Sequence, residues 1–261
     1  DYSSAGTGRW DLMAGGSWND GGNTPAHPTA WCKARAGWVS PTTLFNSQVD
    51  VVIPPYATAG RVYKLPIGSA ASDEYFLVSN RNQTGFDTHL PGSGLIIEHC
   101  DDAQGNNTDE NHYLVDIEQA DGQRDLNLNV NRGDAADPFP SGGNTKFTAT
   151  STPNSNAYDG SDSQVSVTNI ATSGANISAT LNVGGSSALH WENNASVVRT
   201  YATVHAKNAW VFFGGIGWRK VHPDAPDGVT NTFMTACDAL ANARHVDVNI
   251  DGVALYQSVG R

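Results

Sequence analysis

The strongest constraint on the fold is a repeated alternation of apolar and polar residues in short segments. Residues 49–53, 61–65, 164–170 and 176–183 follow this pattern, and turn-forming residues separate them. Successive side chains of a β-strand point to opposite faces, so a period of two predicts strands with one buried face. We therefore expect a mainly β chain, with residues 49–183 forming a β-sandwich-like domain.

A glycine and serine segment divides the chain. Gly184-Gly185-Ser186-Ser187 has the composition of a linker, so we expect a linker over residues 184–190. Residues 191–261 then combine short strand-like segments with one amphipathic helix, and they are expected to form a small α+β module. The apolar residues of that helix fall on one stripe: Val229, Phe233, Cys237, Leu240 and Ala241.

The N-terminal segment has a different character. Residues 8–18 place Met13 in a glycine-rich turn between Trp10 and Trp18. Residues 25–38 predict a short helix, because a proline suits its first turn and a glycine its C-terminal cap.

These motifs resemble the Met-turn region of the immune-inhibitor-A family, which are secreted bacterial zinc metallopeptidases. Residues 85–87 and 90–95 are similar to the family's Gly-Phe-Asp and Leu-Pro-Gly-x-Gly-Leu motifs, and the resemblance extends over residues 1–183. It implies that residues 1–48 are a remnant of the catalytic domain, in which Met13 floors the metal site. The module at 191–261 resembles no family in particular.

The zinc-binding motif of that family is missing here. In the family an H-E-x-x-H helix lies shortly upstream of the Met-turn, whereas none of the eight His residues here belongs to such a motif. A catalytic zinc needs three protein ligands. We therefore expect zinc only in an intact parent protein, no catalytic residue in this chain, and no hydrolysis by the chain alone.

Acidic residues dominate the charge of the chain. The formal net charge is −11, and residues 98–137 contain eleven acids but only two bases. Such a surface repels nucleic acid and attracts cations. Calcium prefers several oxygen ligands on irregular loops, and the family uses structural calcium. The candidate calcium ligands are Asp101, Asp102, Asn106, Asp109, Asp121, Asp134 and Asp137.

Three cysteines leave one without an intramolecular partner. Cys32 and Cys100 stand where members of the family usually carry other residues, and the two departures together imply a Cys32–Cys100 disulfide. Cys237 is then a buried free thiol or is bonded to a second chain. The run Glu98-His99-Cys100 suggests a metal site, but alternation along a strand places His99 on the opposite face from its neighbours.

The C-terminal module is rich in aromatic residues. In so small a domain they serve either the core or a surface that binds a glycan, a surface polymer or another protein. The candidate binding residues are Trp191, Tyr201, Trp210 and Trp218.

Two functions of different classes fit these observations. In the first, the chain is the C-terminal, non-catalytic part of an immune-inhibitor-A-like peptidase, whose cleaved zinc-binding part is a candidate partner. In the second, it is an extracellular structural or adhesive protein that self-assembles into oligomers or filaments on a peptidase-derived scaffold. Both place it outside the cell, and no apolar run approaches the roughly 20 residues of a membrane span.

Overall fold

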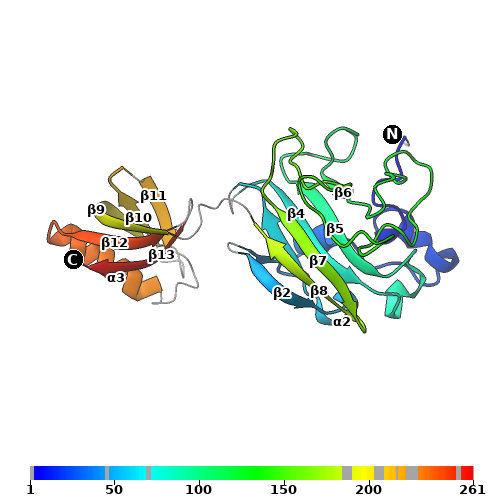
Figure 1. Cartoon of the computed structure of the whole chain (residues 1–261), viewed down its shortest axis with the longest axis horizontal. Coiled ribbons are helices and arrows are strands. Elements are labelled where there is room, and N and C mark those ends of the chain that lie inside the picture. The colour runs from blue at the N-terminus through cyan, green and yellow to red at the C-terminus, as the bar shows by residue number, and fades with distance from the viewer. Residues whose placement is uncertain are drawn as a thin grey trace. The chain divides into compact units, whose positions relative to one another are not determined.

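The computed structural model describes residues 3–44, 47–68, 72–183, 190–202, 209–215, 217–221, 229–250 and 254–260. They belong to two compact units, Asp1–Gly184 and Gly185–Arg261. Strands predominate in both, which confirms the mainly β fold class (Figure 1). The expected linker lies outside the described residues, except for His190. Within the described ranges, no helix is long and apolar enough to span a membrane.

The first unit contains two sheets and a few short helices. Its strands are β1 (Thr42–Thr43), β2 (Gln48–Ile53), β3 (Tyr63–Pro66), β4 (Glu74–Arg81), β5 (Gly94–Asp101), β6 (Val115–Ile117), β7 (Ser166–Ser173) and β8 (Asn176–Asn182). Its helices are α1 (Ala30–Arg35) and α2 (Tyr56–Ala59), with 3-10 turns η1 (Gly8–Trp10), η2 (Gly15–Gly22) and η3 (Gly85–His89). One sheet has the strand order β1-β3-β4-β5-β6 and the other β2-β8-β7.

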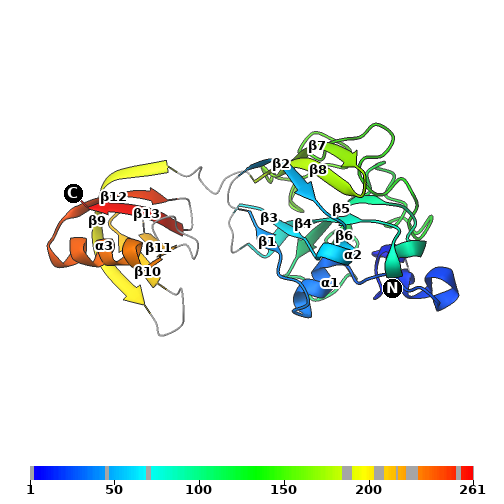
Figure 2. The ribbon, with the colours of Figure 1, turned by 90° about the horizontal axis from the view of Figure 1, so that it is seen from below.

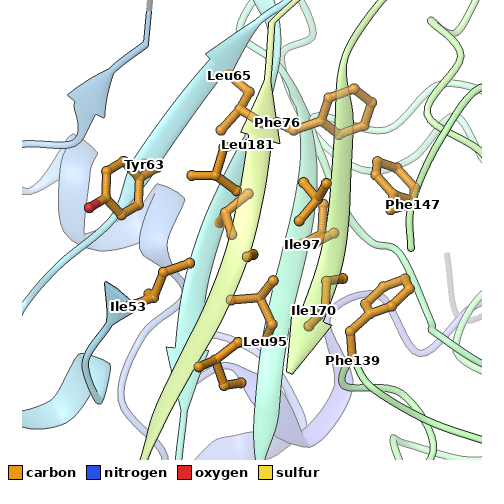
Figure 3. Packing of buried hydrophobic residues seen from close by; sticks show 14 of the residues in the cluster. Ile53, Tyr63, Leu65, Phe76, Leu95, Ile97, Phe139, Phe147, Ile170 and Leu181 are labelled. Carbon is orange, nitrogen blue, oxygen red and sulfur yellow. The ribbon is translucent and has the colours of Figure 1, made fainter. Parts of the chain in front are cut away.

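The main core lies between the two sheets (Figure 3). Phe76, Leu95 and Ile97 face it from the five-stranded sheet, and Ile170 and Leu181 face it from the three-stranded sheet. Leu95 and Ile97 are alternate positions of β5, as the period of two predicts. The β-sandwich-like arrangement expected for residues 49–183 therefore describes this pair of sheets.

The opposite face of the five-stranded sheet is covered by the N-terminal segment, which contains α1, and by α2 (Figure 2). All eight residues of β5 are consequently buried. The segment before residue 48 and the two sheets share one compact unit, so the structure sets no domain boundary at residue 48. The predicted short helix is present as α1, capped by the Thr29 hydroxyl, which accepts a hydrogen bond from the Cys32 N–H.

The described residues of the second unit form a closed barrel and one helix. Its elements are β9 (His190–Ala202), β10 (Ala209–Phe213), β11 (Gly217–Val221), α3 (Val229–Ala241), β12 (His245–Ile250) and β13 (Ala254–Gly260), with the barrel order β10-β11-β13-β12-β9. Helix and strands agree with the expected α+β composition.

The buried face of α3 differs from the predicted stripe. Of the predicted stripe, Phe233 packs half-buried against the core and Cys237 is half-buried, whereas Leu240 and Ala241 are exposed; the fully buried residues are Thr232, Ala236 and Ala239. The most deeply buried positions of α3 therefore carry small side chains, which the apolar pattern of the sequence did not single out.

Candidate functional site

The glycine-rich turn is fixed by Asp11, which is 4% exposed. One oxygen of its carboxylate accepts hydrogen bonds from the backbone N–H groups of Met13 and Thr29, at 3.1 and 3.0 Å. The other oxygen accepts the hydroxyl of Thr7 at 3.1 Å. A Cβ atom at Gly16 would lie 2.5 Å from the Asp11 carbonyl oxygen, so only glycine permits this close turn.

A buried ion pair joins the turn to the sheet. Arg81, at the end of β4, binds both oxygens of Asp87 at 2.9 and 3.0 Å, and both side chains are almost completely buried. Two more of its N–H groups donate to the carbonyl oxygens of Trp10 and His27, at 3.0 and 3.3 Å. Asp87 also accepts the N–H of His27 at 2.8 Å. This network holds two separate loops of the N-terminal segment.

A second buried carboxylate holds α1 on β5. The two oxygens of Glu98 accept the N–H groups of Ala30 and Trp31, at 2.8 and 2.9 Å. Burial raises the pKa of Glu98 to about 7, although these hydrogen bonds and Arg81 counteract it. The positive end of a helix favours a carboxylate at this position. Glu98 and Cys100 face α1 while His99 faces the other side, as the strand period predicts.

The predicted Met-turn residue lies at the surface. Met13 is 74% exposed, and it borders an apolar pocket of about 380 Å³ together with Leu12, Pro28, Trp31 and Trp38. We name these five residues the apolar face. Trp38 is 70% exposed. Large apolar side chains that gather at a surface typically mark an interaction site.

The expected disulfide is not formed in the structure, where both cysteines are free thiols. The Cys32 thiol points to the Asp11 carboxylate at 3.8 Å, and the Cys100 thiol points to the Glu98 carbonyl oxygen at 3.8 Å. Local partners thus orient the two sulfur atoms. Burial raises the pKa of Cys32 to about 11 and that of Cys100 well above its usual value, so neither thiol is activated.

The candidate calcium ligands lie in several separate parts of the structure. Asp102 accepts hydrogen bonds from the Trp31 indole and the Tyr75 hydroxyl, while Asp101 binds His112 at 2.6 Å. Asn106 and Asp109 accept N–H groups within their own loop. Within the described ranges, no group of three or more His, Cys, Asp or Glu side chains is arranged to hold a metal ion.

The remaining candidates are Asp134 and Asp137, which share one turn, and Asp121, whose charge acts on Asp137. Burial raises the pKa of Asp137 to about 6, and the charges of Asp134 and Asp121 raise it further, while hydrogen bonds from Trp10 and Asp134 lower it. The Trp10 indole donates to Asp137 at 2.8 Å, and the Asp134 N–H donates to the same oxygen at 2.9 Å. The carboxylates are therefore turned to protein donors.

A histidine cluster was not anticipated from the sequence. Ring contacts run from Phe76 through His99 and Tyr158 to His112, with centroid distances of 4.3, 4.0 and 4.2 Å, and the His99 and Tyr158 rings are stacked while the other two pairs are tilted. The two ring nitrogens of His99 lie 2.9 Å from a Glu74 oxygen and 3.3 Å from a Glu118 oxygen. No local sequence signal predicts this cluster, because its members come from distant segments.

The structure describes the side chains of two of the four candidate aromatic residues of the C-terminal module. Tyr201 is 55% exposed, and Trp210 is half-buried with the ammonium group of Lys220 5.8 Å from its ring centroid. Trp191 lies in β9 and Trp218 in β11, but their side chains lie outside the described part of the chain. Cys237 is half-buried, with its thiol 3.7 Å from the Thr200 hydroxyl.

No protein-family model and no curated protein matches this sequence. The resemblance to immune-inhibitor-A peptidases therefore stays a prediction that rests on the motifs.

Proposed function

We propose that this chain is the non-catalytic C-terminal part of a secreted immune-inhibitor-A-like zinc metallopeptidase. In this proposal, residues 1–184 form a wall of the substrate cleft, and a zinc-binding helix from another segment or chain packs on the apolar face. The observation that supports the proposal most is the exposure of Met13 within a turn that Asp11 and Arg81 hold rigidly. A rigid turn that presents an apolar side chain to water is stabilised when a partner covers it.

The zinc chemistry belongs to the proposed partner. The side chains beside Met13 that can bind a metal are Asp11 and Cys32, and Asp11 is already occupied by three protein donors. These residues do not fit a catalytic zinc, which needs three protein ligands. We therefore assign no catalytic step to this chain.

Native and denaturing mass spectrometry of the secreted protein tests the proposal. We expect a second polypeptide whose sequence contains H-E-x-x-H, and we expect Met13→Asp and Trp38→Ser to weaken its association at least about tenfold, because each alters the apolar face. Val52→Ser is the matched control, since Val52 is 58% exposed on β2, outside that face. A native mass equal to one copy of this chain would contradict the proposal.

The second candidate function, self-assembly, has one observation in its favour. β2 ends the strand order of its sheet and exposes Val49 and Val52, at 71% and 58%. An exposed apolar edge strand is a template for strand addition. In the same mass measurement, multiples of this chain without a second sequence favour this function over the first.

We also propose that Ca²⁺ stabilises the turns that contain Asp121, Asp134 and Asp137. The charges of Asp134 and Asp121 raise the pKa of the buried Asp137, and a cation held beside these turns together with backbone and amide oxygens would offset this repulsion. We expect chelation with EGTA to lower the thermal midpoint of residues 1–184 by about 5 °C or more, because loss of a bound ligand destabilises the folded state.

The calcium proposal has an internal control. Asp134→Asn removes one of the three carboxylates, so the variant is expected to show a smaller EGTA effect than the unaltered protein. Differential scanning calorimetry with added Ca²⁺, with added Mg²⁺ and with EGTA makes the comparison. An unchanged midpoint in all three conditions would show that no calcium binds there.

A further inference from the structure

The second unit of the chain has the strand arrangement of an OB-fold. Its strands close into a barrel in the order β10-β11-β13-β12-β9, and α3 lies between the third and fourth of them in the sequence (Figure 1). β11 and β13 pair in parallel, whereas the other four neighbouring pairs are antiparallel. The OB-fold is a five-stranded Greek-key barrel that binds oligonucleotides and oligosaccharides on the face of its second and third strands. Those strands are β10 and β11 here.

A fold does not by itself assign a ligand, so the side chains on this face decide. Along β10, Ala209, Val211 and Phe213 are buried in the barrel core. Trp210 and Phe212 alternate with them and are half-buried on the outside of the barrel. The proposed peptidase-related role uses residues 1–184 alone, so it gives these outward aromatic rings no task.

The strand register surrounds the two rings with another aromatic side chain and two cations. Tyr201 and Arg199 of β9 pair with Trp210 and Phe212, and Lys220 of β11 pairs with Trp210. Directly opposed residues of neighbouring strands point to the same face. The Lys220 ammonium group accordingly lies 5.8 Å from the Trp210 ring centroid. Tyr201 and Arg199 are both exposed. We name these five residues the aromatic face.

The charge of the aromatic face is positive, because two of its five residues are cations. Of the acids whose side chains are described in this unit, Asp238 lies on α3 and Asp247 on β12, so neither belongs to the face. Residues 185–261 as a whole contain six acids and six bases. The positive charge is therefore local to this face and is not a property of the entire unit.

The combination of flat rings and a few cations selects the ligand. A sugar ring presents C–H groups that stack on aromatic side chains, and a carboxylate pairs with Arg or Lys. A neutral glycan would leave both cations unused. Single-stranded nucleic acid gains much of its affinity from many phosphate contacts along a basic groove, and equal numbers of acids and bases do not favour such contacts. An acidic oligosaccharide fits the face best.

We propose that the aromatic face binds an acidic oligosaccharide built of uronic acid residues. Its sugar rings stack on the three aromatic side chains, and its carboxylates pair with Arg199 and Lys220. Neighbouring strands lie about 4.8 Å apart and alternate residues of one strand about 6.6 Å apart. The three rings consequently extend in two directions over the face and contact more than one sugar of the chain.

Calorimetric titration of the full chain with pentagalacturonate tests the proposal. We expect saturable binding at least about tenfold tighter than that of the fully methyl-esterified pentamer, which has the same rings but no charge. An eight-nucleotide oligothymidylate carries negative charges and bases that stack, and we expect it to bind at least about tenfold more weakly than pentagalacturonate. Equal or tighter binding of the ester or of the oligothymidylate would overturn the proposal.

Variants locate the site. Trp210→Ala is expected to weaken pentagalacturonate binding about fivefold or more, whereas Trp210→Tyr keeps an aromatic ring and should weaken it less than about threefold. Tyr201→Ser tests the same face at a more exposed position and is expected to weaken binding about threefold or more. Arg199→Gln should weaken binding of the acid about fivefold or more and of the ester less than about twofold, because it removes only a charge.

Matched controls replace exposed residues outside the aromatic face. Met234→Ser removes an apolar side chain from α3, and Arg244→Gln removes an arginine between α3 and β12. Each should change binding less than about twofold. Circular dichroism melts confirm that the variants fold. If pentagalacturonate does not bind, or if Tyr201→Ser and Arg199→Gln bind it as the unaltered chain does, the proposal is wrong.

Discussion

Replacing Arg81 by Met is expected to destabilise residues 1–184 by about 3–5 kcal/mol, because it leaves the Asp87 carboxylate buried without its cation. The same change removes the hydrogen bonds to the carbonyl oxygens of Trp10 and His27. The glycine-rich turn should therefore loosen before the sheets do. Hydrogen exchange measured by mass spectrometry during urea unfolding reports both effects and separates the two units of the chain.

Two further variants serve as controls for Arg81→Met. Arg124→Met removes an exposed arginine and should cost less than about 0.5 kcal/mol. The double variant Arg81→Met with Asp87→Leu removes both charges, so it should be more stable than Arg81→Met alone. A loss below about 1 kcal/mol for Arg81→Met would show that the ion pair does not hold the N-terminal segment.

Replacing His99 by Gln is expected to destabilise the same unit by roughly 3 kcal/mol near pH 6, because Glu74 and Glu118 lose the cation between them. Burial lowers the pKa of His99, but the hydrogen bonds and charges of Glu118 and Glu74 outweigh burial and raise it to about 9. The protonated imidazole is therefore the form that the folded state favours.

The contribution of His99 to the free energy of unfolding depends on pH. The folded pKa of about 9 exceeds the ordinary value of 6.5, so the stabilisation is complete below pH 6.5 and is lost as the pH rises through 9. Burial raises the pKa of Glu98 to about 7 and those of Asp116 and Asp137 to about 6, so the stability that their protonated forms supply is already lost once the pH has risen to about 7. Burial also raises the pKa values of Cys32 and Cys100, whose contribution is lost as the pH rises toward 9 and beyond. Between pH 7 and pH 8 the decline is therefore assigned to His99.

Urea unfolding from pH 5.5 to pH 9.5 measures the effect. Between pH 7 and pH 8 the free energy of unfolding of the unaltered chain should fall, and that of His99→Gln should fall clearly less. His89→Gln is the matched control, since the side chain of His89 is 47% exposed. Equal slopes in all three proteins would contradict the assignment.

The sequence by itself predicted most of the strands and the alternation of side chains along them. Alternation along 94–101 placed Glu98 and Cys100 on one face and His99 on the other, because this property depends on the backbone alone. The short helix, the strands of the C-terminal module and the mainly β class were predictable for the same reason. Each of these features depends on neighbours within a few residues.

Only the tertiary structure decided which distant residues meet. Arg81 donates to the carbonyl oxygen of Trp10, which is 71 positions away in the sequence. The backbone N–H of Tyr158 donates to the carboxylate of Glu74, which is 84 positions away. The free thiols of Cys32 and Cys100 and the buried face of α3 also depend on packing distances. A sequence pattern gives the direction of a side chain within its own element, but the contacts of that side chain are set by how the sheets and loops pack in three dimensions.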